Sequence, residues 1–436
     1  MRTARAISGL VFLLLWLAPQ AKGDIAILLE EPYSYDGAFA GTGHSAVYLT
    51  RVCAASPVEL RRCREGENGV VLSRYHRVGG YDWIAIPMTP YLYAVDNPED
   101  VPLYADAKLV ALLRDRYRRA HLESVAPNAS DGEAERGDWP QLIGEAYDRT
   151  IYGFQIETTA AQDDEFIRAY NSRSNVAAYK LVSGNCADFV REAANFYYPH
   201  AVKRNIIADL DVMTPKQAAK SLVQYGKRHP DLHFSSLVIP QVPGSLRRSR
   251  PVHGLVESVF KAKKYEAPLM FFHPFIAVGF ASAYLLSGRF DPAHRALVYD
   301  PTGDLEEPLS AQQRRAYSRD LSGLMRGNSE LGNDAEPWKN VEAGARLGLD
   351  PQGRPILEVP SDAGTVQVGI SRSNVFDRGT SLELTENLLE TRLRQELRRG
   401  SVKASGIGLQ SDWNFLQKVI SSQQSERQAI ADTGNQ

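Results

Sequence analysis

The residues that could do covalent chemistry lie in the stretch Asn185-Cys186-Ala187-Asp188-Phe189-Val190. A helix is predicted to begin at Cys186, with Ser183 or Asn185 as its cap. The first turn of a helix offers unsatisfied N–H groups and a positive end, which favour a thiolate over a thiol. Cys186 is therefore predicted to be a nucleophile, and the alternative is an inert buried cysteine. Four further residues share its helical face: Phe189, Val190, Ala193 and Tyr197.

A thiol nucleophile needs a group that handles protons, and His44 is the candidate. It follows Gly41-Thr42-Gly43, where the backbone can approach a ligand, and it begins a predicted strand over 44–52. If this strand pairs antiparallel with a strand over 70–76, His44 lies opposite a residue between Leu72 and His76.

His76 is the preferred third residue, because a second imidazole could hold the first in the right tautomer. Ser73 and Asp82 remain alternatives for this role.

These side chains are positioned by a predicted antiparallel meander and a set of helices, which make an α+β fold. The strands are expected over 25–29, 44–52, 70–76 and 83–87, from their apolar and alternating residues. Helices are expected over 106–123, 161–172, 186–198 and 214–225, where Thr214 can cap the last one and Pro215 suits its first turn.

The other two cysteines point to a disulfide. Cys53 and Cys63 are ten positions apart on either side of a polar stretch, so they can close a short loop. Cys186 is then the odd cysteine, and a free thiol in an exported chain is a liability unless it is buried or used.

The Gly43-His44-Ser45-Ala46-Val47-Tyr48-Leu49 strand and the Asn185–Val190 helix start resemble the circularly permuted branch of the papain-like superfamily. That branch includes NlpC-related and lecithin retinol acyltransferase-like enzymes. The resemblance covers about residues 25–225 and implies Cys186 as nucleophile, His44 as base and His76 as the third polar residue. The segment between His44 and the next strand, which holds the other two cysteines, departs from the family pattern.

The N-terminus predicts export. Arg2 and Arg5 precede an apolar run over 7–18, and Ala21-Lys22-Gly23 resembles a signal-peptidase site, so residues 1–23 are predicted to be a cleaved signal peptide. The alternative is an uncleaved anchor. A secreted or periplasmic protein is expected.

Length and punctuation predict two units. A chain of 436 residues exceeds the size of one typical core. Residues 24–239 are expected to form the papain-like domain. Residues 240–251, with three prolines and three basic residues, are expected to be a linker, and residues 252–436 a helical and β-hairpin region of unknown role. A hairpin over 345–359, a strand over 365–370 and a helix over 380–399 are predicted there.

One apolar segment, 269–286, is long enough to cross a membrane. His273 and Pro274 interrupt it, and its flanking lysines oppose the positive-inside rule, so burial within the protein is predicted rather than membrane association.

The expected function is thiol-dependent acyl transfer by an exported enzyme with an amidase- or peptidase-like Cys-His site. Its substrate is expected to be an envelope peptide or amide. The alternatives are a lipid-ester acyltransferase and a non-catalytic accessory protein that keeps the fold. No cofactor or metal ion is expected, and the formal charge of -2 argues against a nucleic-acid partner.

Overall fold

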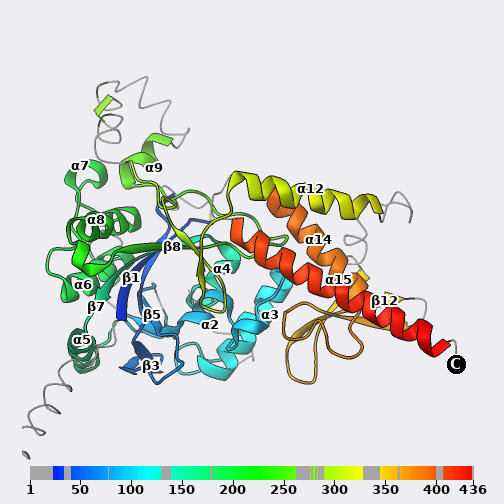
Figure 1. The fold of residues 1–436 in the computed structure, drawn as a ribbon. Helices are drawn as coiled ribbons and strands as arrows, with labels where there is room; N and C mark the ends of the chain where they lie inside the picture. Colours follow the sequence, from blue (N-terminus) through cyan, green and yellow to red (C-terminus); the bar gives the residue numbers. More distant parts are fainter. Residues whose placement is uncertain are drawn as a thin grey trace, which may run out of the picture.

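A computed structural model of the chain describes most of its residues (Figure 1). The described ranges are 23–33, 41–76, 78–128, 139–176, 179–180, 182–261, 289–327, 344–361, 364–398 and 406–434, with the single positions 275, 278, 279 and 282. The predicted signal peptide lies outside these ranges except for Gly23, which begins the first strand.

An eight-stranded sheet forms the centre of the described structure, in the order β10-β9-β8-β7-β1-β2-β5-β6. Neighbouring strands are antiparallel, except that β8 and β9 run parallel. The strands are β1 (Gly23–Glu30), β2 (His44–Leu49), β5 (Val70–Ser73), β6 (Ile84–Pro87), β7 (Ile151–Thr158), β8 (Ser235–Ile239), β9 (Leu297–Tyr299) and β10 (Leu305–Glu306).

Alternating side chains give this sheet two buried faces. Ile25, Ile27 and Leu29 of β1 pack with the helices on one face, whereas Leu28 belongs to the core on the other face. The first face is covered by α5 (Ala160–Ser172), α6 (Cys186–Tyr197) and α8 (Pro215–Arg228) (Figure 1).

The second face carries α2 (Met88–Tyr93), α3 (Ala107–His121) and α4 (Glu145–Asp148), together with elements from the C-terminal part of the chain. Those elements are α12 (Ala311–Gly327), α14 (Leu382–Arg398), α15 (Gly406–Gly434) and a sheet of β11 (Arg346–Leu349), β12 (Pro355–Ser361) and β13 (Gly364–Gly369). Two short helices are α7 (Ile206–Asp209) and α9 (Leu255–Lys261).

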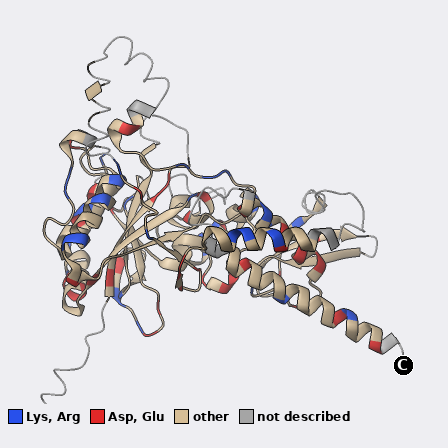
Figure 2. Ribbon diagram, turned by 45° about the horizontal axis from the view of Figure 1, so that its top comes forward, with Lys and Arg blue, Asp and Glu red and all other residues tan. Residues whose placement is uncertain are grey.

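Basic and acidic residues are both spread over the ribbon (Figure 2).

The predicted α+β class is confirmed, as is the antiparallel order of the first four predicted strands. Three helix starts follow their caps, since the side chains of Asp106, Asn185 and Thr214 each accept a backbone N–H from the first turn. The strand predicted over 44–52 is too long: β2 ends at Leu49, and a separate strand begins at Val52. A bend at Thr50 and Arg51 divides the two.

The division of the chain at 240–251 stays a prediction. The eight-stranded sheet contains strands from both sides of this segment, since β9 and β10 follow it in the sequence. Two side chains of the segment form hydrogen bonds with residues before it. The Gln241 amide donates to Tyr147 O at 2.8 Å, and Ser249 Oγ donates to Glu31 at 2.7 Å.

The apolar segment 269–286 falls mostly outside the described residues. At two of its described positions the predicted burial is wrong, since Phe275 is 90% exposed and Val278 63% exposed. Within the described ranges, no helix has both the length and the apolar character needed to span a membrane.

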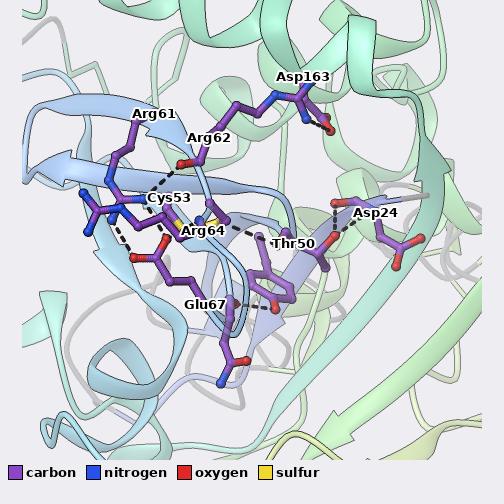
Figure 3. The surroundings of a disulfide bond; sticks show 11 residues. Asp24, Thr50, Cys53, Arg61, Arg62, Arg64, Glu67 and Asp163 are labelled. Atoms are coloured by element: carbon purple, nitrogen blue, oxygen red, sulfur yellow. Dashed lines mark hydrogen bonds and ion pairs between the residues drawn. A yellow bond between two sulfur atoms is a disulfide. The ribbon is translucent and has the colours of Figure 1, made fainter. Parts of the chain in front are cut away.

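The predicted disulfide is confirmed, because Cys53 and Cys63 are bonded and Cys186 is free. The bond links the two ends of a hairpin made of β3 (Val52–Ser56) and β4 (Glu59–Arg62). The Cα atoms of the two cysteines are 4.9 Å apart. The loop after β4 is held by Glu67, which accepts from Arg61 and from the Arg64 N–H, both at 2.6 Å (Figure 3).

Replacing both bonded cysteines by serine is expected to lower the free energy of unfolding by about 3 kcal/mol, because the unfolded chain regains the entropy of an open loop. Urea unfolding of the Cys53→Ser/Cys63→Ser variant checks this, with the reduced unmodified protein as its control. A loss under about 1 kcal/mol would contradict the expectation.

Candidate active site

Cys186 is the first residue of α6, and a capping box fixes this helix start. Asn185 Oδ1 accepts the Asp188 N–H at 2.9 Å, while the Asp188 carboxylate accepts the Asn185 N–H at 3.4 Å. Arg204 holds Asp188 through an ion pair of 2.6 Å, and the Asn185 amide donates to Met213 O at 3.0 Å. The cap binds the Asp188 N–H, and the N–H groups of Cys186 and Ala187 lie at the same end of the helix as the sulfur.

The predicted apolar face of α6 is confirmed, and the helix packs against β2 through this face. Phe189, Val190, Ala193 and Tyr197 are all buried. Val47 and Leu49 of β2 belong to the same hydrophobic core. The thiol therefore lies where α6 meets the start of β2.

The Cys186 thiol is nearly buried, at 8% exposure, and this burial raises its pKa to about 11. The amide and hydroxyl of Ser45 and the amide of Ala187 act in the opposite direction, since they favour the thiolate, whereas the Glu30 carboxylate disfavours it. The sequence-based expectation of a lowered pKa is wrong for this conformation, because removal from water outweighs the helix end.

His44 begins β2, and the backbone before it requires glycine. Gly43 has a φ of 68°, and a Cβ at this position would collide with the carbonyl oxygen of Glu30. Glu30 is also the register partner of His44 across the β1–β2 pair. The close approach of the two chains places the imidazole next to the end of β1.

The predicted register of β2 and β5 is confirmed, since Val47 pairs with Leu72 and Leu49 with Val70. Tyr75 lies opposite His44 in the continuation of this register. The two rings stack with centroids 4.2 Å apart and an interplanar angle of 12°.

None of the three candidates for the third residue, all of them described, is the stacking partner of His44. His76 is exposed and meets the Tyr179 ring edge-on at 5.5 Å. Ser73 is buried in β5, and its hydroxyl makes no hydrogen bond. Asp82 pairs with Arg74 at 2.7 Å, and the Arg74 guanidinium lies over the Phe189 ring of α6. The role predicted for His76 stays a prediction.

Burial lowers the pKa of His44 well below its ordinary value, and the nearby positive charge of Arg149 lowers it further. The imidazole is therefore neutral at physiological pH, which is the form of a general base. Its Nε2 atom is buried and has no hydrogen-bond partner.

His44 and Cys186 come to the same end of β2, but no hydrogen bond joins these two described side chains. Ser45 lies beside the sulfur on the α6 face, and strand alternation turns His44 to the other face, where it stacks on Tyr75. Proton transfer between His44 and Cys186 thus requires a local rearrangement at the start of β2.

A buried charge cluster lies beside His44 on that face. Glu30 and Glu145 are 0% exposed, and Arg149 binds both, with Nη1 3.2 Å from Glu30 Oε2 and Nε 2.7 Å from Glu145 Oε2. The Tyr91 hydroxyl donates to Glu30, and the Tyr33 ring lies 4.5 Å from the Arg149 guanidinium.

Burial raises the pKa of Glu30, and that of Glu145 well above its usual range, although Arg149 opposes both shifts. Two carboxylates therefore share one cation, which favours retention of a proton between them.

Among the described residues, one group of side chains has ligand atoms close enough for a metal ion: Cys53, Cys63 and Glu67. Its two sulfurs are bonded to each other, so this group does not fit a metal.

No protein-family model matches the chain, and no curated protein matches it. A crystal structure of the type VI secretion system effector TseH aligns with 51% of this chain and 95% of its own, at 14% sequence identity and a TM-score of 0.24. An alignment with this score establishes neither a shared fold nor a shared activity. The resemblance to permuted papain-like enzymes therefore stays a prediction.

The raised pKa gives an expected reactivity profile for Cys186. The rate of alkylation by iodoacetamide is expected to rise about tenfold per pH unit between about pH 7 and 10, because the thiolate fraction is still growing there. Mass spectrometry of the timed reaction measures it. In the urea-unfolded chain, the matched control, the rate is expected to level off above about pH 8.5. A plateau below about pH 8 in the folded protein would instead support an activated thiolate.

Proposed function

We propose that the protein is a thiol-dependent acyl-transfer enzyme in which Cys186 is the nucleophile and His44 the base. One observation carries the proposal: the free cysteine occupies the first turn of a capped helix, and the sulfur lies beside the Ser45 amide, one residue from a buried neutral histidine. A helix start supplies N–H donors for an oxyanion, and a neutral imidazole can accept the thiol proton.

The chemistry follows from two neutral groups. When substrate binds, His44 takes the thiol proton as Cys186 Sγ forms a bond to the acyl carbon. The carbonyl oxygen becomes an oxyanion, held by N–H groups at the start of α6. His44 then gives the proton to the leaving amine or alcohol. Water or a second acceptor then attacks the thioester while His44 takes its proton. The C–S bond breaks, the acyl product leaves, and His44 returns the proton to the Cys186 sulfur.

The resting pair differs from a preformed thiolate-imidazolium pair. The pKa of Cys186 is raised and that of His44 is lowered, so both shifts favour the neutral forms. Catalysis then requires that the bound substrate separate the His44 ring from the Tyr75 ring, so that the imidazole can reach the Cys186 sulfur. His76 is proposed as a third residue only if it enters the site in that arrangement.

The proposed substrate class is an envelope peptide or amide, in keeping with the predicted signal peptide and the disulfide, which is typical of oxidising compartments. Incubation of the purified protein with isolated peptidoglycan, followed by mass spectrometry of the soluble fraction, tests this class. Fragments are expected from the unmodified protein and not from Cys186→Ala. Release of fatty acid from phospholipid vesicles, without peptidoglycan cleavage, would move the substrate to lipid esters. Neither product would favour the accessory role.

A further inference from the structure

A pocket separate from Cys186 lies beyond the carboxyl ends of β8 and β9, the parallel pair of the described sheet. The segments that leave these two strands, 240–243 and 300–302, form part of its wall. Ligands in sheets with parallel strands commonly bind beyond the carboxyl ends of those strands. The volume of the cavity is about 90 Å³, which is below that of drug-sized ligand sites and limits the occupant to a small molecule.

One wall of this pocket carries two arginines around a single buried carboxylate. Arg392 Nε lies 2.8 Å from Asp412 Oδ2, and Arg372 Nη2 lies 3.7 Å from Asp412 Oδ1. Arg372 also donates to Ser411 Oγ at 2.7 Å, and Arg392 donates to the Leu103 carbonyl. Two cations thus meet one anion, and each guanidinium has more N–H donors than these partners use.

The other two carboxylates of the pocket have their own partners. Glu396 pairs with Arg248 at 2.5 Å. Asp300 accepts the N–H and the hydroxyl of Thr302 at 3.0 and 2.7 Å. The donors from Thr302 are neutral and do not offset the Asp300 charge, so the excess of cations is confined to the wall where Arg372 and Arg392 face Asp412. That wall is where an anionic group of a ligand would bind. A neighbouring hollow shares Arg372 and adds Lys418 and Glu306.

Much of the remaining lining is apolar. It includes Val101, Leu103, Val242 and Val298 and several prolines. An apolar ligand body would be removed from water here, while a planar carboxylate matches the fork of a guanidinium.

We propose that this pocket binds a small organic acid, with its carboxylate on Arg372 and Arg392 and its apolar body against the valines and prolines. The proposal does not depend on chemistry at Cys186.

Isothermal titration calorimetry of the full chain with hexanoate, hexan-1-ol and hexylamine tests the proposal. Hexanoate is expected to bind at one site, and the alcohol and the amine at least about tenfold more weakly, since they lack the charge-assisted bonds. Equal binding of hexan-1-ol, or binding of none of the three, would overturn it. Inorganic phosphate that binds as tightly as hexanoate would also overturn it, because the apolar wall would then contribute nothing.

A matched pair of variants locates the site. Arg372→Gln is expected to weaken hexanoate binding about tenfold, whereas Arg119→Gln, on the exposed side of α3, is expected to leave it unchanged. Circular dichroism checks that both variants are folded. If Arg372→Gln does not fold, the ligand series on the unmodified protein still decides the outcome.

Discussion

A Cys186→Ala variant is expected to lose at least about a thousandfold of the rate at which the protein cleaves p-nitrophenyl acetate, because no other described thiol can form the acyl intermediate. The substitution removes one sulfur from a buried position, so the fold should persist. The matched control is Cys53→Ser/Cys63→Ser, which removes two sulfurs outside the site and is expected to keep the rate within about threefold at a temperature where it remains folded. Equal rates for Cys186→Ala and the unmodified protein would contradict the proposed nucleophile.

The base is tested by a second pair of substitutions in the same assay. His44→Gln is expected to lower the rate about a hundredfold or more, which is the usual loss when a general base is removed. His76→Gln changes an exposed imidazole and so decides the role predicted for His76. If His76→Gln loses as much as His44→Gln, His76 belongs to the site. If His76→Gln keeps the full rate, His76 is a surface residue that packs against Tyr179 and has no catalytic role.

An Arg149→Met variant is expected to lower the free energy of unfolding by about 3–5 kcal/mol, because it leaves Glu30 and Glu145 buried without their shared cation. Urea unfolding measures the loss. The matched control is Arg119→Met, which breaks an ion pair of a 59% exposed side chain, and for which no comparable loss is expected.

The loss in Arg149→Met should depend on pH. The folded-state pKa of Glu30 and of Glu145 lies above the usual value, so each carboxyl contributes stability below about pH 4.3, and this contribution is lost as the pH rises through the folded-state pKa. Without Arg149 the ionised forms are still less favourable. The variant should therefore be more destabilised at about pH 8 than at about pH 5. The opposite trend would mean that the two carboxyls are not buried together.

Glu145→Gln separates charge from packing in this cluster. It removes one of the two carboxylates and keeps Arg149 paired with Glu30, so its stability near pH 7 should lie within about 1 kcal/mol of the unmodified protein. A loss as large as that of Arg149→Met would show that packing of Glu145, rather than charge balance, stabilises the region.

Local signals predicted the elements around the site well. Asn185 and Thr214 are short polar residues before apolar helical periodicity, and both proved to be caps. The register of β2 and β5 followed from their alternation and from the cysteines that close the inserted hairpin. These features depend on residues close in sequence, or on one pairing with few alternatives.

The electrostatics of the site could not be read in the same way. The helix start that favours a Cys186 thiolate is local, but the burial that raises the pKa depends on how β2 and α6 pack. The cluster of Glu30, Glu145 and Arg149 joins residues from β1 and from a helix more than a hundred positions away. Nothing in the sequence around Glu30 indicates that its partners come from there.

One central strand was missed although a signal was present. β7 pairs with both β1 and β8, so it lies in the middle of the sheet. Its residues Ile151–Thr158 include a run of β-branched and aromatic side chains that is typical of a strand. Strands β9 and β10 are two or three residues long, and their place at the sheet edge depends on the parallel pairing of β8 and β9, which no local pattern indicates.

The proposal that Cys186 is a nucleophile is tested most directly by intact-mass and peptide mass spectrometry of the protein, quenched in acid during reaction with p-nitrophenyl acetate. One acetyl group is expected on Cys186, removable by hydroxylamine as a thioester is, absent in Cys186→Ala and longer-lived in His44→Gln, where the base that activates water is lost. Acetyl groups found on lysines alone, or no adduct in a protein that still releases p-nitrophenol, would contradict it.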